Sequence, residues 1–401
     1  MTEHTDITAL LAPEVQAFIA AHTHDDIREL ALQQHPFPQI PRTALLQQIQ
    51  SRKKSEKKLP TWFRTANIIY PPALSIEQTS SEQTARYKSQ FIKGGSMADL
   101  TGGFGVDTFV LSDNFDTVLH IERDSSLSHI AAHNFRQLGA AHITCIQDDC
   151  IRYLQDSNLT FDTLYLDPAR RNDRQQKVFL LEDCTPDIFG HWPLFSSRAR
   201  HIWIKTSPLL DIQDTMNKLG HIAHIFILAT DNEVKELLFH IDTLHPAAAP
   251  PLIHTANIKK DHTDTWETTY GAGDDAGVRY DLPQQYLYLP NAAIMKSGQF
   301  RQLGTAFGLA KLHPNSHLYT ASELLSFPGK VFEITSVIPY QKKNFRQWQQ
   351  LTANVSTRNF PDNSEALIRK HKIKNGGDLF LFFTTLHTGD KAVLFCRPAA
   401  S

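Results

Sequence analysis

The chain has few cysteines and lacks the spacing that cysteine-based structure requires. Its 401 residues include only four cysteines, which are Cys145, Cys150, Cys184 and Cys396, and no two of them form a Cys-x-x-Cys pair. A disulfide framework and a structural zinc site are therefore both disfavoured, and a reducing cytoplasm is the compartment we expect. The 20 histidines are scattered, and no metal site is predicted from them.

Long apolar runs are also missing. No stretch approaches the roughly 18 apolar residues that a membrane span requires. The first residues, MTEHTDITALLAPEVQ, carry acids where a secretory signal needs a basic segment. We therefore expect no membrane partner. A length of 401 residues suggests two to three domains at about 100–200 residues each.

Charge is balanced overall but unevenly distributed. The formal net charge is −2, yet Lys and Arg against Asp and Glu give −10 for residues 91–280 and +7 for residues 281–401. The basic third is suited to a polyanionic partner, because cations near phosphates release condensed counterions. A solvated charged face explains the same count, and charge alone leaves both interpretations open.

Apolar periodicity predicts three regions. Residues 1–74 form an N-terminal helical region, with helices over 27–32 and 43–58. Short apolar strands then alternate with helices, which is typical of an α/β fold with a Rossmann-like, doubly wound sheet. The strands are expected at 96–101, 117–122, 142–147, 163–167, 201–206, 222–229 and 253–259.

The remaining segments complete the predicted architecture. A helix is expected over 178–189, and the polar, Gly-containing stretch 261–283 is interpreted as a linker. The end of the chain forms a small α+β module, with a helix over 291–309 and a hairpin that joins 378–386 to 391–396 around His-Thr-Gly-Asp.

The strongest chemical signal follows the first predicted strand. The sequence Asp-Leu-Thr-Gly-Gly-Phe-Gly-Val-Asp-Thr (99–108) has glycines that let the backbone approach a ligand, and it opens a helix. A dinucleotide site requires Gly-x-Gly-x-x-Gly, and a carboxylate beside the loop has the wrong charge for a pyrophosphate. An acid there could instead accept from the ammonium group of a methionine moiety. The pattern favours S-adenosylmethionine over a nicotinamide cofactor, with candidate ligands Asp99, Thr101, Gly102, Gly103, Gly105 and Asp107.

Two further acids end the next two strands. Glu122 is placed to accept from both hydroxyls of a ribose, and Asp149 from an adenine amino group. A single acid at a strand end is more often a helix cap or a surface residue. Three acids at successive strand ends make a cofactor site the better interpretation.

The fourth strand ends in Asp167-Pro168-Ala169-Arg170-Arg171. We expect Asp167 and Pro168 to face the methyl group, with Asp167 holding or deprotonating a nitrogen acceptor, while Arg170 binds a substrate phosphate as a planar fork. Taken alone, Asp-Pro is a common turn, so this interpretation depends on the preceding motif. The fifth strand ends in Lys205-Thr206-Ser207 without a cysteine nucleophile, which disfavours methylation of a pyrimidine carbon.

These motifs together resemble a known family. DLTGGFGVDT, HIERD, IQDDC and YLDPARR occur in the order found in class I S-adenosylmethionine-dependent methyltransferases, over about residues 75–260. EQTSSEQTARYKS, PNAAIMKSGQF, HPNSHLYT, STRNFP and IRKHKIKNGGDLFLFFTTL resemble bacterial members with a C-terminal THUMP-like domain after a ferredoxin-like segment. The resemblance implies a methyltransferase domain over 75–262, a ferredoxin-like segment over 281–330 and a THUMP-like domain over 331–401.

The resemblance also implies an RNA substrate, since THUMP domains bind RNA, chiefly tRNA. We expect N-methylation of an RNA base, in tRNA more than rRNA. Methyltransferases of exocyclic amines usually show Pro-Pro and an aromatic residue after the acid, whereas Ala169 and Arg170 stand near those places here. Aromatic residues among the C-terminal cations, such as Tyr340 and Phe345, suit an RNA surface or the core of the module. A methyltransferase for a protein or a small molecule, and a non-catalytic binding module, remain alternatives. The sequence indicates no oligomeric state.

Overall fold

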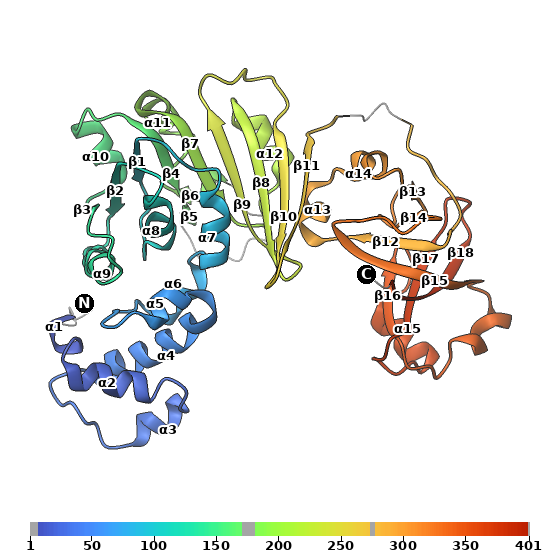
Figure 1. Cartoon of the computed structure of the whole chain (residues 1–401), viewed down its shortest axis with the longest axis horizontal. Coiled ribbons are helices and arrows are strands. Elements are labelled where there is room, and N and C mark those ends of the chain that lie inside the picture. Colours follow the sequence, from blue (N-terminus) through green and yellow to red (C-terminus); the bar gives the residue numbers. More distant parts are fainter. Residues whose placement is uncertain (1–6, 171–180, 273–276, 400–401) are drawn as a thin grey trace. The chain divides into compact units, whose positions relative to one another are not determined.

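The computed structural model describes residues 7–170, 181–272 and 277–399 of the chain (Figure 1). They form two compact units, which are described separately. The first unit comprises residues 1–223 and 236–249, and the second comprises residues 224–235 and 250–401. Among the described residues, no helix has both the length and the apolar character needed to cross a bilayer.

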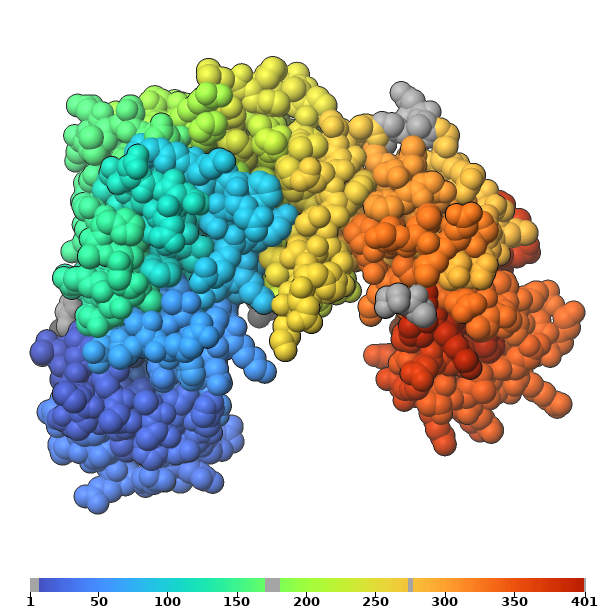
Figure 2. Space-filling view, viewed as in Figure 1, coloured from blue at the N-terminus to red at the C-terminus, as the bar shows by residue number. Residues whose placement is uncertain are grey.

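The first unit begins with a group of helices, as the apolar periodicity predicts. Their apolar faces meet in one core that contains Val15, Ile49 and Trp62, and that core continues onto Phe104 and Val106 of the following domain. In the space-filling view, these helices form a continuous surface in shades of blue on the face shown (Figure 2). The helices are α1 (Ile7–Leu10), α2 (Pro13–Ala21), α3 (Ile27–Leu32), α4 (Arg42–Lys58), α5 (Pro60–Arg64), α6 (Ala73–Gln78) and α7 (Glu82–Ser89).

A mostly parallel sheet follows in the first unit. Its strands are β1 (Ser96–Asp99), β2 (Thr117–Glu122), β3 (Ile143–Gln147), β4 (Phe161–Leu166), β7 (Ala199–Thr206) and β9 (Glu233–Asp242). They are ordered β3-β2-β1-β4-β7-β9, and only β9 runs antiparallel to its neighbour β7. The order reverses direction between β1 and β4, so the carboxyl ends of both strands meet at the switch point where such sheets bind ligands.

Helices connect these strands and cover the sheet. They are α8 (Val106–Ser112), α9 (Ser125–Gln137), α10 (Cys150–Asp156), α11 (Trp192–Arg198) and α12 (Ile212–Lys218). Right-handed crossovers place α8 and α9, which lead outward from β1 to β3, on the face opposite α10, which leads back to β4. The sheet is therefore doubly wound, and the predicted fold class is confirmed.

The second unit contains a group of three paired strands and a larger sheet. Within the group, β8 (Ile222–Thr230) pairs in parallel with β10 (Leu252–Ile258), which pairs antiparallel with β11 (Thr263–Thr269). The larger sheet has the order β13-β14-β12-β15-β18-β17-β16. Its strands are β12 (Tyr286–Pro290), β13 (Ala310–Lys311), β14 (Tyr319–Ala321), β15 (Gly329–Pro339), β16 (Asn354–Arg358), β17 (Phe380–Thr385) and β18 (Lys391–Pro398). The expected hairpin is the antiparallel pair β17–β18.

Four short helices accompany the larger sheet, namely α13 (Ala292–Ser297), α14 (Phe300–Ala306), α15 (Ser364–His371) and the 3-10 helix η2 (Lys342–Gln347). The aromatic residues predicted among the C-terminal cations belong to the core of this domain. Trp348 is fully buried, and Tyr340 and Phe345 pack against it. The rings are therefore explained by packing, while the cations around them remain exposed.

Several predicted elements are wrong in detail. The expected linker 261–283 contains strand β11, because Thr-Asp-Thr-Trp-Glu-Thr-Thr alternates and buries Trp266. The expected helix over 291–309 is two helices, since Gly298 adopts φ +71° and ends α13. Within 178–189, the described residues form the 3-10 turn η1 (Leu181–Asp183) and strand β6 (Cys184–Thr185), which pairs with β5 (Ala169–Arg170). Strand β9 was not anticipated, and Cys184 is buried.

Glycine at position 105 offers a test of the packing beneath α8. A Cβ at Gly105, which has φ +82°, would lie 2.4 Å from Cζ of Phe135, whereas Gly139, with φ +80°, has nothing within 4 Å. Gly139→Ala should cost about 1 kcal/mol of unfolding free energy from backbone strain alone. Gly105→Ala should cost about 1–3 kcal/mol more, because it also overpacks the interior. Equal losses for the two variants in urea unfolding would contradict the packing argument.

Candidate active site

The glycine-rich turn, residues 100–105, joins β1 to α8 and is fixed by backbone hydrogen bonds. The Gly102 N–H donates to the Ile121 carbonyl at 2.9 Å, and the Gly105 N–H donates to the Gly102 carbonyl at 3.0 Å. A Cβ at Gly102 would lie 2.4 Å from Nε2 of His120. The turn therefore lies directly on the His120 ring, and position 102 has no room for a side chain.

His120 on β2 is a buried residue that sequence reasoning missed. It is fully buried, and neither ring nitrogen has a hydrogen-bond partner in the described structure. Burial lowers its pKa to about 4, so the ring is neutral near pH 7. Its ring meets Phe135 edge to face at 5.3 Å. The neutral ring serves as a packing surface beneath the turn.

The side chain of Asp99 supports the turn. One carboxylate oxygen accepts from the Thr101 N–H at 3.0 Å, and the other accepts from the Thr108 hydroxyl at 2.6 Å. Burial raises the pKa of Asp99 to about 7, although these two hydrogen bonds act in the opposite direction. Both oxygens thus have partners within the protein. The contact between Asp99 and a cofactor stays a prediction.

Glu122 ends β2, the strand next to β1, and Asp149 follows the carboxyl end of β3, the strand beyond β2. The two oxygens of Glu122 accept from the Gly103 N–H at 2.9 Å and from the Asp124 N–H at 2.8 Å. Asp149 is exposed and caps α10, where one oxygen accepts from the Ile151 N–H at 3.0 Å. The structure brings Glu122 to the turn itself and places Asp149 one strand further along the same edge of the sheet.

Thr101 connects the turn to the predicted catalytic segment. Its hydroxyl oxygen accepts from the Asp167 N–H at 2.6 Å, and the neighbouring Leu100 N–H donates to the Tyr165 carbonyl at 2.9 Å. Pro168 is buried behind Asp167. The backbone of Arg170 lies in β5, but its side chain and the whole of Arg171 lie outside the described residues.

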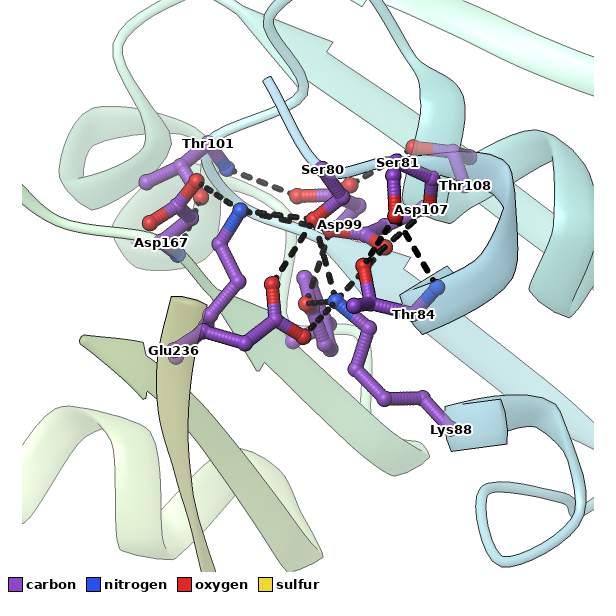
Figure 3. A network of polar contacts seen from close by, with 12 residues as sticks. Ser80, Ser81, Thr84, Lys88, Asp99, Thr101, Asp107, Thr108, Asp167 and Glu236 are labelled. Atoms are coloured by element: carbon purple, nitrogen blue, oxygen red, sulfur yellow. Dashed lines mark hydrogen bonds and ion pairs between the residues drawn. The ribbon is translucent and has the colours of Figure 1, made fainter. Parts of the chain in front are cut away.

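The Asp167 carboxylate is the end of a network of charged and polar side chains (Figure 3). Its Oδ2 lies 2.6 Å from the Lys205 ammonium group, which also donates to Ser80 at 2.9 Å. Ser80 in turn donates to Asp107 at 2.7 Å. The sequence singled out Asp167, Asp107 and Lys205, and the structure brings all three together.

A second ammonium group, that of Lys88 on α7, lies deeper in the network. It is 2.7 Å from Asp107 Oδ1 and 2.8 Å from Glu236 Oε1. It also donates to the hydroxyl groups of Ser80 at 3.0 Å and Tyr165 at 3.2 Å. One buried lysine thereby joins α7, the start of α8, strand β4 and strand β9.

Burial differs sharply along this network. The side chain of Lys88 is 0% exposed and that of Lys205 is 7% exposed, whereas that of Asp167 keeps 40% of its surface accessible. Burial would raise the pKa of Asp107, but Lys88 and Lys205 outweigh it and lower that pKa. The pKa of Asp167 is raised, because desolvation of its carboxylate outweighs the ion pair with Lys205. Asp167 is thus the accessible end of a mostly buried ion cluster.

Sequence reasoning missed four members of the network: Ser80, Lys88, Tyr165 and Glu236. Ser80 and Lys88 precede the sheet, and Glu236 lies on the unanticipated strand β9. Segment 77–89, which contains Ser80 and Lys88, was noted only through its resemblance to the family. Asp107, predicted to contact the cofactor, has Lys88 and Tyr165 as partners instead, and its predicted role remains untested.

Removing the charge of Lys88 should strongly destabilise the protein. Lys88→Met leaves Asp107 and Glu236 buried without their shared cation, and we expect a loss of about 3–5 kcal/mol in unfolding free energy. Lys54→Met is the matched control, since Lys54 pairs with the exposed Glu77 at the surface and its loss should have little effect. Urea denaturation measures both. Similar small losses would show that the network does not stabilise the fold.

The raised pKa of Asp99 predicts a pH-dependent contribution to stability. Its folded pKa of about 7 lies above its ordinary value, so the folded state keeps a proton that the unfolded chain has lost. This contribution is present below about pH 4 and is lost as the pH rises towards 7. His120 acts in the opposite direction, since its pKa is lowered. The stability of the wild type minus that of Asp99→Asn should therefore fall between pH 4 and 7, as measured by urea unfolding. A pH-independent difference would contradict the assignment.

Comparisons with known proteins extend this picture. A model of a ferredoxin-like domain matches residues 286–328, and a THUMP domain-like model matches residues 329–398. No curated protein matches the chain significantly. Among solved structures, a candidate methyltransferase from Porphyromonas gingivalis W83 is 30% identical, with a TM-score of 0.89 over 98% of this chain and 99% of that one.

Other solved structures resemble only part of the chain. An O-methyltransferase from Bacillus cereus in complex with SAH is 10% identical, with a TM-score of 0.30 over 40% of this chain and 80% of that one. A tRNA m1G37 methyltransferase from M. jannaschii is 9% identical, with a TM-score of 0.29 over 41% and 50% of the two chains. The full-length relative, the doubly wound sheet and the C-terminal match agree, and the chain belongs to the class I methyltransferases with a C-terminal THUMP-like domain.

Proposed function

We propose that the chain transfers a methyl group from S-adenosylmethionine to a base nitrogen of RNA, in tRNA more than in rRNA. The observation that carries the proposal is the hydrogen bond between the Asp167 N–H and Thr101. It fixes an accessible carboxylate beside the glycine-rich turn, at the switch point of a doubly wound sheet.

The residues present fit this cofactor. Glu122 lies at the turn, where a carboxylate suits ribose hydroxyls, and the exposed Asp149 suits an amino group of adenine. The network behind the turn contains two lysines and the three carboxylates of Asp107, Asp167 and Glu236, a formal charge of −1. That charge favours a cationic sulfonium and disfavours a diphosphate. When bound, S-adenosylmethionine supplies a methyl group activated by its positively charged sulfur.

Asp167 and Lys205 have distinct roles in the proposed reaction. Asp167 would accept the hydrogen bond of the acceptor N–H and take its proton as the nitrogen forms its new bond to the methyl carbon; the carbon–sulfur bond would break, with its electron pair left on sulfur. The raised pKa of Asp167 helps it to retain that proton. Lys205 holds the carboxylate through the 2.6 Å ion pair and is itself fixed by Ser80. Lys205 is therefore a positioning residue.

The second unit supports an RNA substrate. It contains the THUMP domain-like match, and a group of its cations around the buried Trp348 is exposed. Phosphates of structured RNA are the natural partners of such a surface. The exposed cations are Lys342, Lys343, Arg346, Arg369, Lys370, Lys372 and Lys374.

The test compares modified nucleosides in a deletion strain and its complemented derivatives. Mass spectrometry of total RNA should show one methylated nucleoside missing from the deletion strain and restored by the wild-type chain. Asp167→Asn should restore at least 100-fold less of it, because general-base catalysis contributes about 10²–10⁴-fold. Asp116→Asn, which alters an acid at the opposite end of the sheet from the site, is the matched control and should restore it fully.

Calorimetry on purified Asp167→Asn separates catalysis from folding, since this variant should still bind S-adenosylmethionine. An unchanged nucleoside profile in the deletion strain would overturn the RNA substrate. In that case a protein or small-molecule acceptor, with the C-terminal domain as an interaction module, becomes the better assignment.

A further inference from the structure

The second unit contains a small basic hollow that no role described so far uses. It has a volume of about 190 Å³ and lies beside α14. Two arginines, Arg279 and Arg301, line it together with the glycines Gly277, Gly304 and Gly308. Arg279 Nη2 donates to the Gly308 carbonyl at 3.0 Å, which fixes one guanidinium group at the wall of the hollow.

The size and lining of the hollow limit what it can hold. Pockets for larger organic ligands usually measure about 300–1,000 Å³ and are mostly apolar. This hollow is smaller, and none of its described lining residues is acidic. Its three glycines leave the backbone uncovered, and Gly308 has open space where a Cβ would stand. A compact anion fits these properties better than a drug-sized molecule.

Lys311 adds a buried positive charge next to the hollow. Its N–H donates to the Arg279 carbonyl at 2.8 Å, and its side chain is almost completely buried at 3% exposure. The ammonium group donates to the Pro314 carbonyl at 2.8 Å and lies over the rings of Phe300 and Tyr319. Within residues 277–399, no carboxylate lies at ion-pair distance from Lys311. Burying an ammonium group without a counter-ion is costly.

Two titratable groups here have lowered pKa values, chiefly because they are buried. Burial and, to a smaller extent, the charge of Arg301 lower the pKa of Lys311 to about 8. Burial, Lys311 and Arg358 lower the pKa of His317 to about 4. The nearby carboxylate of Asp281 is engaged elsewhere, since it accepts from the Leu282 N–H at 2.8 Å and from Gln284 at 2.7 Å.

We propose that this hollow binds a phosphate group, with Arg279 and Arg301 as its hydrogen-bond donors and Lys311 as the charge behind it. Planar guanidinium groups match the oxygens of a phosphate in two-point contacts. The site goes beyond the proposed function, because holding a phosphate requires no methyl transfer. RNA is one source of the phosphate group, and a small phosphorylated molecule is the other.

Titrations of the full chain test the site with three probes: inorganic phosphate, a short RNA with a terminal phosphate, and the same RNA without it. Phosphorus NMR reports binding of inorganic phosphate, and fluorescence anisotropy reports binding of labelled RNA. The double variant Arg279→Ala/Arg301→Ala should weaken phosphate binding at least 10-fold. The phosphate affinity of Arg301→Lys should lie between those of this variant and the wild type, because lysine keeps the positive charge but lacks the planar guanidinium group that makes two-point contacts.

Lys330→Ala is the matched control, since it removes one exposed cation of the same unit outside the hollow, and it should bind phosphate as the wild type does. Circular dichroism verifies that every variant is folded. Equal binding of inorganic phosphate by the wild type and the double variant, or none by either, would overturn the proposal. RNA is the source if the double variant binds RNA more weakly and if the slope of log affinity against log salt concentration becomes shallower by about 0.9 for each lost phosphate contact. If only inorganic phosphate binding weakens, the site stands and its source is a small molecule.

Discussion

The buried ammonium group of Lys88 is the constraint on which the candidate active site depends. It pairs with Asp107 at the start of α8 and with Glu236 on β9, and it donates to Tyr165 on β4. These partners are spread over more than 100 residues of the chain, and none could lose Lys88 without leaving a charge or a hydroxyl uncompensated in the interior. The ion cluster therefore fixes the relative positions of the helices and strands that support Asp167.

The acids named from the sequence divide into two groups in the structure. Asp99 and Asp107 face inward, where one supports the glycine-rich turn and the other joins the ion cluster. Glu122, Asp149 and Asp167 keep accessible surface at the edge of the sheet. Acids that support the site from within and acids that keep accessible surface thus occur in the same set of sequence motifs. The sequence alone therefore does not distinguish the inward-facing acids from the accessible ones.

The fold was largely predictable because alternating strands and helices leave a strong local pattern. The strands over 96–101 and 117–122 correspond to β1 and β2, and the helix over 27–32 is α3. Strand β9 was missed because Glu-Val-Lys-Glu-Leu-Leu-Phe-His-Ile-Asp carries charges at its start and reads equally well as a helix. The site was predictable only where it follows strand ends. Lys88 and Glu236 contribute through tertiary contacts, which no local spacing records.

The hydroxyl of Thr101 has a consequence for the order of events at the site. The backbone N–H of Asp167 is hydrogen-bonded to the side chain of Thr101 in the glycine-rich turn. A movement of the turn is therefore transmitted to Asp167, and a movement of Asp167 is transmitted to the turn. Occupancy of the turn and occupancy beside Asp167 should then share a coupling free energy, and thermodynamic linkage makes that coupling reciprocal. Binding of either reactant would then favour binding of the other before any bond changes.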